Sequence, residues 1–480
     1  MYLPIALAII IASTNPGRSA VPNDGVDDGP ALRAAITRAC ATDHLLKISA
    51  GVFEISQEPG KLGGLNITGC SGLSIVGEGR NATKLRMIPR PMSRGEDYYL
   101  INIDGNSSDI EVTMLTLDGR RAEFESTNST AEQVHLIRTY QAKRVDIHDA
   151  DLINSIGAGI KAIDLNDISV NNVRFRGHGR GGFEAHSNVT DVRLVGNSFY
   201  DIADQHIAQE GGGGNSRWSI VANNHGPHGT GSRLVYDLGS GATNLALIGN
   251  TIIDGGVQGY SLDRFAFIGN IFDQSEADGG TPLYFKGGNH QGAILGNVIR
   301  SESIVNEAYA LRVASLDDAR DPNSLAIVGN VAMHAANTGF HLVSGLGRLT
   351  VDANVISATQ DNLSSGIAVS NLLNKDQRSV VISDNSITNE DTGVVVSIGA
   401  CTTCTQDAIA IGGNAVFSSK LNARGFYNET HNHFGIPYPS MCRGDGNVMD
   451  VLGTTWAKTG TVNPQPNEVE GCTLYGEAVP

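Results

Sequence analysis

Ionisable side chains recur at similar points of successive strand-like segments in the middle of this 480-residue chain. If the apolar residues of each segment point inward, the alternation of a β-strand predicts which side chains point outward. The outward residues in this interpretation are Lys161, Glu184, His186, His206, Glu210, Arg233, Asp237, Gln258, Tyr260, Tyr284, Lys286, Arg312 and His341. They supply carboxylates, imidazoles, cations and aromatic rings, the groups that proton transfer and sugar stacking require.

Glu210 and Asp237 are the pair with the clearest chemical implication. We expect His186, Glu210 and Asp237 to stack in one column, because adjacent β-coils lie about 4.8 Å apart. Two carboxylates at that spacing repel when both are ionised, so one pKa should rise unless a cation lies between them. Solvent exposure alone also produces a polar outer face, so the clustering supports a site more than any single residue does.

One chemistry that fits this face is β-elimination from a uronate-containing glycan, and it is the one the sequence favours. A base removes the C5 proton while a cation neutralises the substrate carboxylate. Glu184, Glu210 and Asp237 would hold Ca²⁺, the only cofactor suggested. The base would be one of Lys286, Arg312 and Arg233. Sugar rings would bind at the side chains of Glu184, Tyr260, Tyr284, Gln258, Lys161 and His341.

The same face allows three other interpretations. A glycoside hydrolase would use two carboxylates, and a gap of about 5 Å predicts retention whereas about 6.5–9.5 Å predicts inversion. A C5-epimerase would use His186 or His206 as a base. A glycan-binding module of the adhesin or tailspike kind would bind the glycan without catalysing a reaction.

A repeated phrase predicts the scaffold that positions these residues. An apolar run ends in Asn, usually as Gly-Asn, at Asn197, Asn223-Asn224, Asn250, Asn270, Asn297, Asn330, Asn354, Asn385 and Asn414, with Asn172 and Asp149 before them. The spacing is 20 to 33 residues, with strand patterns and no helical period between, which is typical of a β-solenoid. Asn suits a corner because it accepts left-handed dihedrals, and stacked Asn side chains can bond along the column.

The N-terminal segment supports the same architecture. Residues 29–41 read as an amphipathic helix that starts at Pro30 and covers the open edge of the first coil. Asp27-Asp28, Ala34-Ala35, Ala50-Gly51-Val52-Phe53 and Ile75-Val76-Gly77-Glu78-Gly79 resemble the N-terminal segment of the pectate-lyase-like superfamily. The resemblance covers roughly residues 22–420. It implies an all-β fold, a single-stranded right-handed parallel β-helix with an N-terminal capping helix, in a superfamily of lyases, hydrolases, epimerases and tailspikes.

A second, local resemblance concerns activity. Gly280-Thr281, Phe285-Lys286-Gly287-Gly288 and Asn289-His290-Gln291 resemble the arginine-bearing coil of the chondroitinase-B/alginate-lyase family, with Lys in place of Arg. The Glu-x-Glu and the lysine of that family are not found one coil earlier, around Val257–Ser261.

Composition limits the partners and the location. The net charge of −16 suggests neither a nucleic acid nor an anionic membrane surface as partner. Residues 1–20 resemble a signal peptide, and no later stretch is long enough to span a bilayer. We therefore expect a secreted, extracellular or periplasmic protein acting on a polysaccharide, either a monomer or a trimer. Residues 21–420 would form the β-helix, and residues 421–480 a loop-rich C-terminal appendage.

Six cysteines fit an oxidising compartment. Cys40–Cys70 would tie the cap helix to the first coil, Cys401–Cys404 would close a small loop and Cys442–Cys472 would tie the tail, although other pairings stay open. Cys401 and Cys404 with His431 and His433 could instead bind zinc, which a secreted location makes the weaker alternative.

Overall fold

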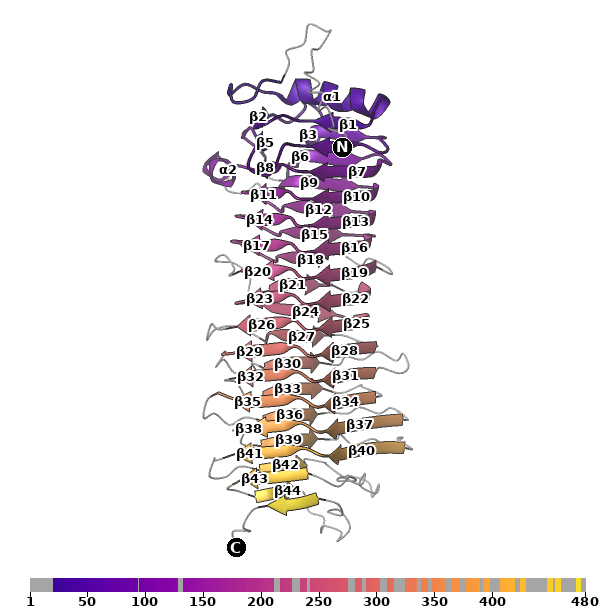
Figure 1. Cartoon of the computed structure of the whole chain (residues 1–480), viewed down its shortest axis with the longest axis vertical. Helices are drawn as coiled ribbons and strands as arrows, with labels where there is room; N and C mark the ends of the chain where they lie inside the picture. Colours follow the sequence, from indigo (N-terminus) through magenta and orange to yellow (C-terminus); the bar gives the residue numbers. More distant parts are fainter. Residues whose placement is uncertain are drawn as a thin grey trace, which may run out of the picture. The chain divides into compact units, whose positions relative to one another are not determined.

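The computed structural model describes the chain in segments. These are residues 20–93, 95–127, 133–210, 216–226, 234–239, 242–274, 281–286, 291–302, 309–314, 324–334, 338–343, 348–359, 365–370, 377–388, 392–397, 406–418, 424–428, 447–451, 454–458 and 472–475. The chain divides into two compact units, residues 1–180 and 181–480, and each is described by itself. Figure 1 labels the elements of both.

Unit 1 is built from three parallel sheets whose strands alternate along the chain. Sheet 1 contains β1 (Leu45–Lys47), β4 (Ser74–Val76), β7 (Ser108–Thr113), β10 (Lys143–His148) and β13 (Asn166–Asn171). Sheet 2 contains β2 (Gly51–Ile55), β5 (Thr83–Met87), β8 (Thr116–Asp118), β11 (Asp151–Ile153) and β14 (Arg174–Arg176). Sheet 3 contains β3 (Gly63–Thr68), β6 (Tyr98–Asp104), β9 (Val134–Tyr140) and β12 (Ile160–Ile163). Three strands therefore complete one coil.

Two helices accompany these coils. Helix α1 (Gly29–Ala41) buries Leu32, Ile36 and Ala39 and lies against β1 and β3 at the N-terminal edge of unit 1 (Figure 1). The disulfide Cys40–Cys70, with Cα atoms 5.5 Å apart, ties its last turn to the segment after β3. The predicted cap helix and this disulfide are confirmed. A second helix, α2 (Arg121–Thr127), follows β8 and buries Phe124.

Unit 2 repeats the same three-strand coil. Its sheet 1 contains β16 (Thr190–Val195), β19 (Ser216–Val221), β22 (Ala242–Ile248), β25 (Asp263–Ile268), β28 (Gln291–Leu295), β31 (Ser324–Val328), β34 (Arg348–Asp352), β37 (Gln377–Ser383) and β40 (Gln406–Gly412). Sheet 2 contains β17 (Ser198–Tyr200), β20 (Asn224–His225), β23 (Thr251–Ile253), β26 (Ile271–Gln274), β29 (Val298–Ser301), β32 (Val331–His334), β35 (Val355–Ala358), β38 (Ser386–Thr388), β41 (Ala415–Ser418), β43 (Asn447–Val451) and β45 (Cys472–Tyr475). Sheet 3 contains β15 (Phe183–His186), β18 (Ile207–Glu210), β21 (Leu234–Leu238), β24 (Gly256–Tyr260), β27 (Leu283–Lys286), β30 (Tyr309–Ala314), β33 (Thr338–Val343), β36 (Ser365–Ser370), β39 (Thr392–Ser397), β42 (Arg424–Asn428) and β44 (Thr454–Lys458).

A column of apolar side chains fills the interior behind sheet 3 of unit 2. Its members are in register from coil to coil and fully buried: Phe183, Ile207, Tyr236, Val257, Leu283, Leu311, Phe340 and Ile367. No coil could bury this column without its neighbours, which is why the repeat stacks. The neighbouring side chains along each strand consequently point outward.

Asparagines line the interior at the corner between sheets 1 and 2 of unit 2. Oδ1 of Asn297 accepts from the backbone N and Nδ2 of Asn270, and its Nδ2 donates to the Phe267 carbonyl and to Oδ1 of Asn330, all at 2.9 Å. The ladder consists of Asn197, Asn223, Asn250, Asn270, Asn297, Asn330, Asn354, Asn385 and Asn414, and each is at most 1% exposed. The predicted bonding of asparagines along a column is confirmed.

The left-handed residue of this corner is not the asparagine, as the sequence had suggested, but the residue before it. Gly249 and Gly269 have φ of 63° and 61°, and Ala222 has 52°. Asn172 takes that left-handed position itself, with φ of 53°, and Val173 is the buried residue after it. Asn172 and Asp149 therefore lie outside the ladder, and at the Asn223-Asn224 repeat Asn223 is the member. Only the residue after the left-handed one has its side chain inside.

The three parallel sheets confirm an all-β fold, the parallel β-helix of the superfamily that the N-terminal segment resembles. Residues 1–19, Arg233, Cys401, Cys404, His431, His433 and Cys442 lie outside the described residues. Strands β42 to β45 fall within residues 421–480, where the sequence predicted loops. None of the described helices is long and apolar enough to cross a membrane.

Candidate functional site

The outer face of sheet 3 in unit 2 carries most of the predicted site residues in two neighbouring columns. One column contains Glu184, Ala208, Asp237, Gln258, Tyr284, Arg312 and His341. The other pairs His186 with Glu210, and farther along Tyr260 with Lys286. The structure thus brings the predicted residues onto one face, in an arrangement that separates acidic from cationic groups.

The acidic end is a carboxylate cluster formed by Glu184, His186, Glu210 and Asp237. The imidazole of His186 lies between two carboxylates, with Nε2 3.5 Å from Glu184 Oε2 and Nδ1 3.4 Å from Glu210 Oε2. Glu184 is only 1% exposed and accepts a hydrogen bond from the Gly181 backbone at 3.1 Å. Glu210 is 41% exposed and His186 21%, so a ligand can reach both.

Asp237 differs from the other members in its proton affinity. Burial, and then repulsion from Glu210 and Asp204, raise the pKa of Asp237 above its usual value. A hydrogen bond from Gln258 and attraction to Lys286 oppose the shift without cancelling it. Asp237 therefore holds its proton to a higher pH than an ordinary aspartate, as the sequence predicted for one of the two carboxyls.

The register of this pair corrects the sequence prediction. Asp237 lies opposite Ala208, not opposite Glu210, because Tyr236 and not Leu234 is the inward residue that pairs with Ile207. The two carboxylates share a face but are offset by two residues and one coil. Strand geometry then puts their Cα atoms roughly 8 Å apart, where stacking in one column would give about 4.8 Å.

The other end of the face is a cation–tyrosine ladder formed by Tyr260, Tyr284, Lys286, Tyr309 and Arg312. Lys286 Nζ lies 4.6 Å from the ring centroid of Tyr284 and 5.4 Å from that of Tyr260. Arg312 Cζ lies 5.3 Å from the Tyr284 centroid and 5.0 Å from that of Tyr309. At these distances the rings attract the cations, so both are held in place while charged.

Two further predicted residues adjoin this ladder. The ring of His341 stacks on Tyr309, with centroids 4.7 Å apart and an interplanar angle of 21°. Gln258 Nε2 donates to Tyr260 Oη. Tyr309 itself was missed from sequence, because it precedes Leu311 by two positions and strict alternation assigns it to the inside.

His206 was wrongly expected to point outward. It is completely buried, its ring stacks on Phe199, and its Nδ1 lies 2.9 Å from Nδ1 of His225. His225 in turn hydrogen-bonds Tyr236 Oη. His225 lies in register with the inward residues Phe199 and Ile252. Aligning the repeats would therefore have predicted from sequence that His225 is buried.

Two further predictions concern Lys161 and a bound metal. Lys161 belongs to unit 1, where its Nζ donates to Gln133 Oε1 at 2.8 Å. No group of three or more His, Cys, Asp and Glu side chains among the described residues is arranged to hold a metal. Glu184, Glu210 and Asp237 thus form no such set, because Glu184 is withdrawn beneath the surface and Asp237 is offset. The binding of Ca²⁺ stays a prediction.

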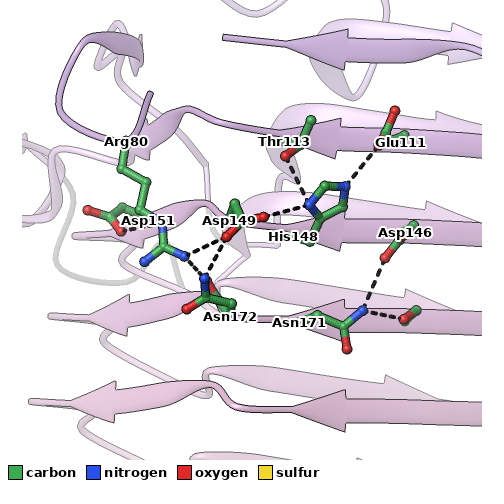
Figure 2. A network of polar contacts seen from close by, with 10 residues as sticks. Arg80, Glu111, Thr113, Asp146, His148, Asp149, Asp151, Asn171 and Asn172 are labelled. Carbon is green, nitrogen blue, oxygen red and sulfur yellow. Dashed lines mark hydrogen bonds and ion pairs between the residues drawn. The ribbon is translucent and has the colours of Figure 1, made fainter. Parts of the chain in front are cut away.

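Unit 1 contains a polar network that the sequence did not reveal, centred on His148 (Figure 2). His148 Nε2 is 2.8 Å from Glu111 Oε1, while its Nδ1 is 3.0 Å from Asp149 Oδ2 and 3.1 Å from Thr113 Oγ1. Burial alone would lower the pKa of His148, but the hydrogen bonds to Asp149 and Glu111 outweigh it and raise that pKa. Each member has an internal partner, so we interpret the network as structural.

Comparisons with known proteins give structural likenesses only. No protein-family profile matches the chain, and no curated protein sequence matches it. The A-module of the Azotobacter vinelandii mannuronan C-5 epimerase AlgE6 is 15% identical over 93% of this chain and 98% of that one, with a TM-score of 0.36. The Streptococcus pneumoniae surface adhesin PfbA is 12% identical over 92% and 91%, with a TM-score of 0.37. A tailspike protein of E. coli bacteriophage HK620 is 11% identical over 96% and 77%, with a TM-score of 0.37. At these scores and identities the likeness does not extend to a shared activity.

Proposed function

We propose that this protein is a secreted carbohydrate-active enzyme that cleaves a polysaccharide laid across sheet 3 of unit 2. The observation that carries the proposal is the carboxyl pair: Asp237, whose pKa is raised, on the same face as the exposed carboxylate of Glu210. Two carboxyl groups with separated proton affinities are what acid–base cleavage of a glycosidic bond requires. The Cys40–Cys70 disulfide supports an oxidising location.

The offset of the pair favours hydrolysis with inversion. Asp237, protonated, would give its proton to the glycosidic oxygen as the bond to the leaving sugar breaks. Glu210 would take a proton from the water that attacks the anomeric carbon from the other side. The carboxyl groups of an inverting pair lie about 6.5–9.5 Å apart, and a Cα offset of roughly 8 Å is compatible with such a gap. His186 would orient Glu210 through its contact with Oε2.

β-Elimination is the second candidate, and the cation–tyrosine ladder is the observation that favours it. Lys286 and Arg312 would neutralise the carboxylate of a uronate, which makes its C5 proton more acidic. His186 lies four coils from Lys286, roughly 19 Å away, so the base must belong to the ladder itself. Tyr284, whose ring is beside both cations, would accept the C5 proton at Oη while the C4–O bond breaks, the C4=C5 double bond forms and the leaving oxygen takes a proton from water. His206 cannot serve as a base for this step or for epimerisation, because it is completely buried.

A product assay separates these functions. The purified protein is incubated with alginate, pectate, chondroitin and neutral glucans, with and without EDTA. Hydrolysis predicts new reducing ends without absorbance at about 235 nm, and NMR of the first product should show an inverted anomer. Rising absorbance at that wavelength would establish elimination instead. If neither signal appears with any of these glycans, the face is a binding surface and the proposal of an enzyme fails.

A further inference from the structure

The backbone nitrogen of Val21 points at a buried carboxylate. Its N–H donates to Asp28 Oδ1 at 2.9 Å, and the Glu54 N–H donates to the other oxygen, Oδ2, at 3.2 Å. Asp28 is only 5% exposed. It occupies the N-cap position of helix α1, yet its side chain forms no capping hydrogen bond to that helix. An aspartate at an N-cap ordinarily accepts from the first turn of its own helix, so this carboxylate is directed instead at the chain before the helix.

The position of the Val21 nitrogen is set by the residues that follow it. The Asn23 N–H donates to the Val52 carbonyl at 2.8 Å, and the Val52 N–H donates to Asn23 Oδ1 at 3.0 Å. Pro22 packs so closely on Gly51 that a Cβ at this glycine would lie 2.2 Å from Pro22 Cβ. All these contacts lie on the C-terminal side of Val21. A break in the chain just before Val21 would therefore leave them intact.

The negative charge of Asp28 has no partner of opposite charge. Among the described residues Asp28 forms no salt bridge, and the neighbouring charges that act on it, Asp24 and Asp27, are both negative. Burial, and with it this repulsion, raises the pKa of Asp28, although the hydrogen bonds from Val21 and Glu54 oppose the shift. A buried carboxylate without a cation is costly, so this position lacks one positive charge.

The sequence before Val21 has the pattern of a segment that is removed. An apolar run at residues 5–12 is followed by the small residues Ser19 and Ala20, which is typical of a signal peptide and its cleavage site. The bond after Ala20 lies at the surface, since Val21 is 41% exposed. Its hydrolysis consumes one water: the oxygen joins the Ala20 carbonyl carbon, which becomes a carboxylate, and both hydrogens go to the Val21 nitrogen, which becomes an ammonium group.

We propose that a secretory peptidase hydrolyses the Ala20–Val21 bond and that the new ammonium group of Val21 forms an ion pair with Asp28. An α-amino group has a pKa of about 7.7–8.0, so it is mostly charged at pH 7. A hydrogen bond between two charged groups is roughly twice as strong as one between neutral groups. The pair would supply the missing positive charge and fasten residues 21–28 to the start of helix α1. The uncut chain cannot form it, because its Val21 nitrogen belongs to an amide.

This inference rests on one part of the proposed function, secretion, and is independent of catalysis. Val21 and Asp28 belong to unit 1, whereas the carboxylate cluster belongs to unit 2. A secreted chain that begins at another residue would refute the ion pair and leave the proposed cleavage of a polysaccharide untouched. Conversely, a protein without enzymatic activity could still be cut before Val21.

N-terminal sequencing of the protein isolated from its natural source tests the processing step. We expect the sequence to begin with Val21, Pro22, Asn23 and Asp24. A chain that begins at any other residue, or that retains residues 1–20, overturns the proposal.

Hydrogen exchange of the backbone amides of β2 tests the ion pair. The processed chain is compared with the full chain and with a processed chain whose Val21 nitrogen is acetylated. We expect exchange about fivefold slower in the processed chain than in the other two, because only a free amine adds a charge opposite Asp28. Asp28→Asn should abolish this difference. Asp24→Asn is the matched control, since it removes a neighbouring negative charge but not the acceptor of Val21, and it should retain the difference.

The acetylated chain guards against a variant that merely misfolds, since it contains no substitution. Equal exchange in the processed and acetylated chains would overturn the ion pair, even if Asp28→Asn does not fold. A difference that persists in a folded Asp28→Asn would overturn it as well, because the charge of Val21 would then act on another group.

Discussion

The corner between sheets 1 and 2 is built in opposite ways in the two units. In unit 1 the interior residues after the left-handed position are apolar, namely Leu115, Ala150 and Val173, and the outer face carries the polar His148 network (Figure 2). In unit 2 the interior residues are the asparagines of the ladder, and the outer face carries exposed aliphatic side chains such as Ile248, Ile268 and Ile271. The backbone of the corner is the same in both, with one left-handed residue followed by one buried side chain.

This reversal shows which properties the coil fixes and which it leaves to the sequence. The coil fixes the direction of each side chain, because register and alternation repeat from strand to strand. It does not require an apolar residue at the interior corner, provided that a polar one has all its hydrogen bonds. Unit 1 consequently has a polar outer face at this corner, and unit 2 has an aliphatic one.

The largest effect should come from breaking the asparagine ladder. Asn297→Ala removes four hydrogen bonds and leaves the buried backbone N–H of Asn270 without its acceptor and the Phe267 carbonyl without this donor, so we expect a loss of roughly 3–5 kcal/mol in unfolding free energy. Asn172→Ala in unit 1 is the matched change at an exposed position and should cost about 1 kcal/mol, mainly for its left-handed backbone. Urea titration followed by circular dichroism measures both, and equal costs would refute the distinction.

The next effect concerns two arginines in similar surroundings. Arg312 in unit 2 and Arg138 in unit 1 both lie over two tyrosine rings, Arg138 at 4.5 Å from Tyr140 and 5.4 Å from Tyr99. Because Arg312 lies on the sheet 3 face of unit 2 that carries the carboxylate cluster, Arg312→Gln should raise KM about tenfold with little change in kcat. Arg138→Gln should leave both constants unchanged. A shift in KM for both variants would mean that the substrate also binds unit 1.

The smallest effect concerns the pH dependence of the His148 network. Since the pKa of His148 is raised in the folded state, its stabilisation is complete below the unfolded value of about 6.5 and is lost as pH rises through the folded pKa. The contribution should be under about 1 kcal/mol, because the side chains are partly exposed. His148→Gln should flatten this part of the stability–pH curve, and a variant that keeps the wild-type slope would remove His148 as its source.

Much of the fold could be predicted from sequence because the same pattern of residues recurs in successive coils. The Asn phrase, the cap helix at residues 29–41 and the Cys40–Cys70 pair each follow from local rules that the structure obeys. The same reasoning placed Glu184, His186, Glu210 and Asp237 on one face, because alternation within a short strand is reliable. It could not supply the register between coils, since each coil has turns of different length.

The errors at the site have specific causes. Tyr236, and not Leu234, is the inward residue opposite Ile207, which offsets Asp237 by two residues from Glu210, and the sequence of residues 234–238 gives no sign of this register. His206 lies in the turn before β18, where strand alternation does not apply. The His148 network escaped notice because it depends on which strands adjoin across coils, which sequence spacing alone does not give.

The rate of polysaccharide cleavage by Asp237→Asn, compared with Asp146→Asn, tests the central claim most directly. Both changes neutralise an outward aspartate on a β-strand, but Asp146 belongs to sheet 1 of unit 1. On whichever glycan the wild type cleaves, we predict a drop of about 10²–10⁴-fold for Asp237→Asn, a similar drop for Glu210→Gln, and the full rate for Asp146→Asn. Wild-type rates for Asp237→Asn and Glu210→Gln, with the fold intact by circular dichroism, would contradict the account.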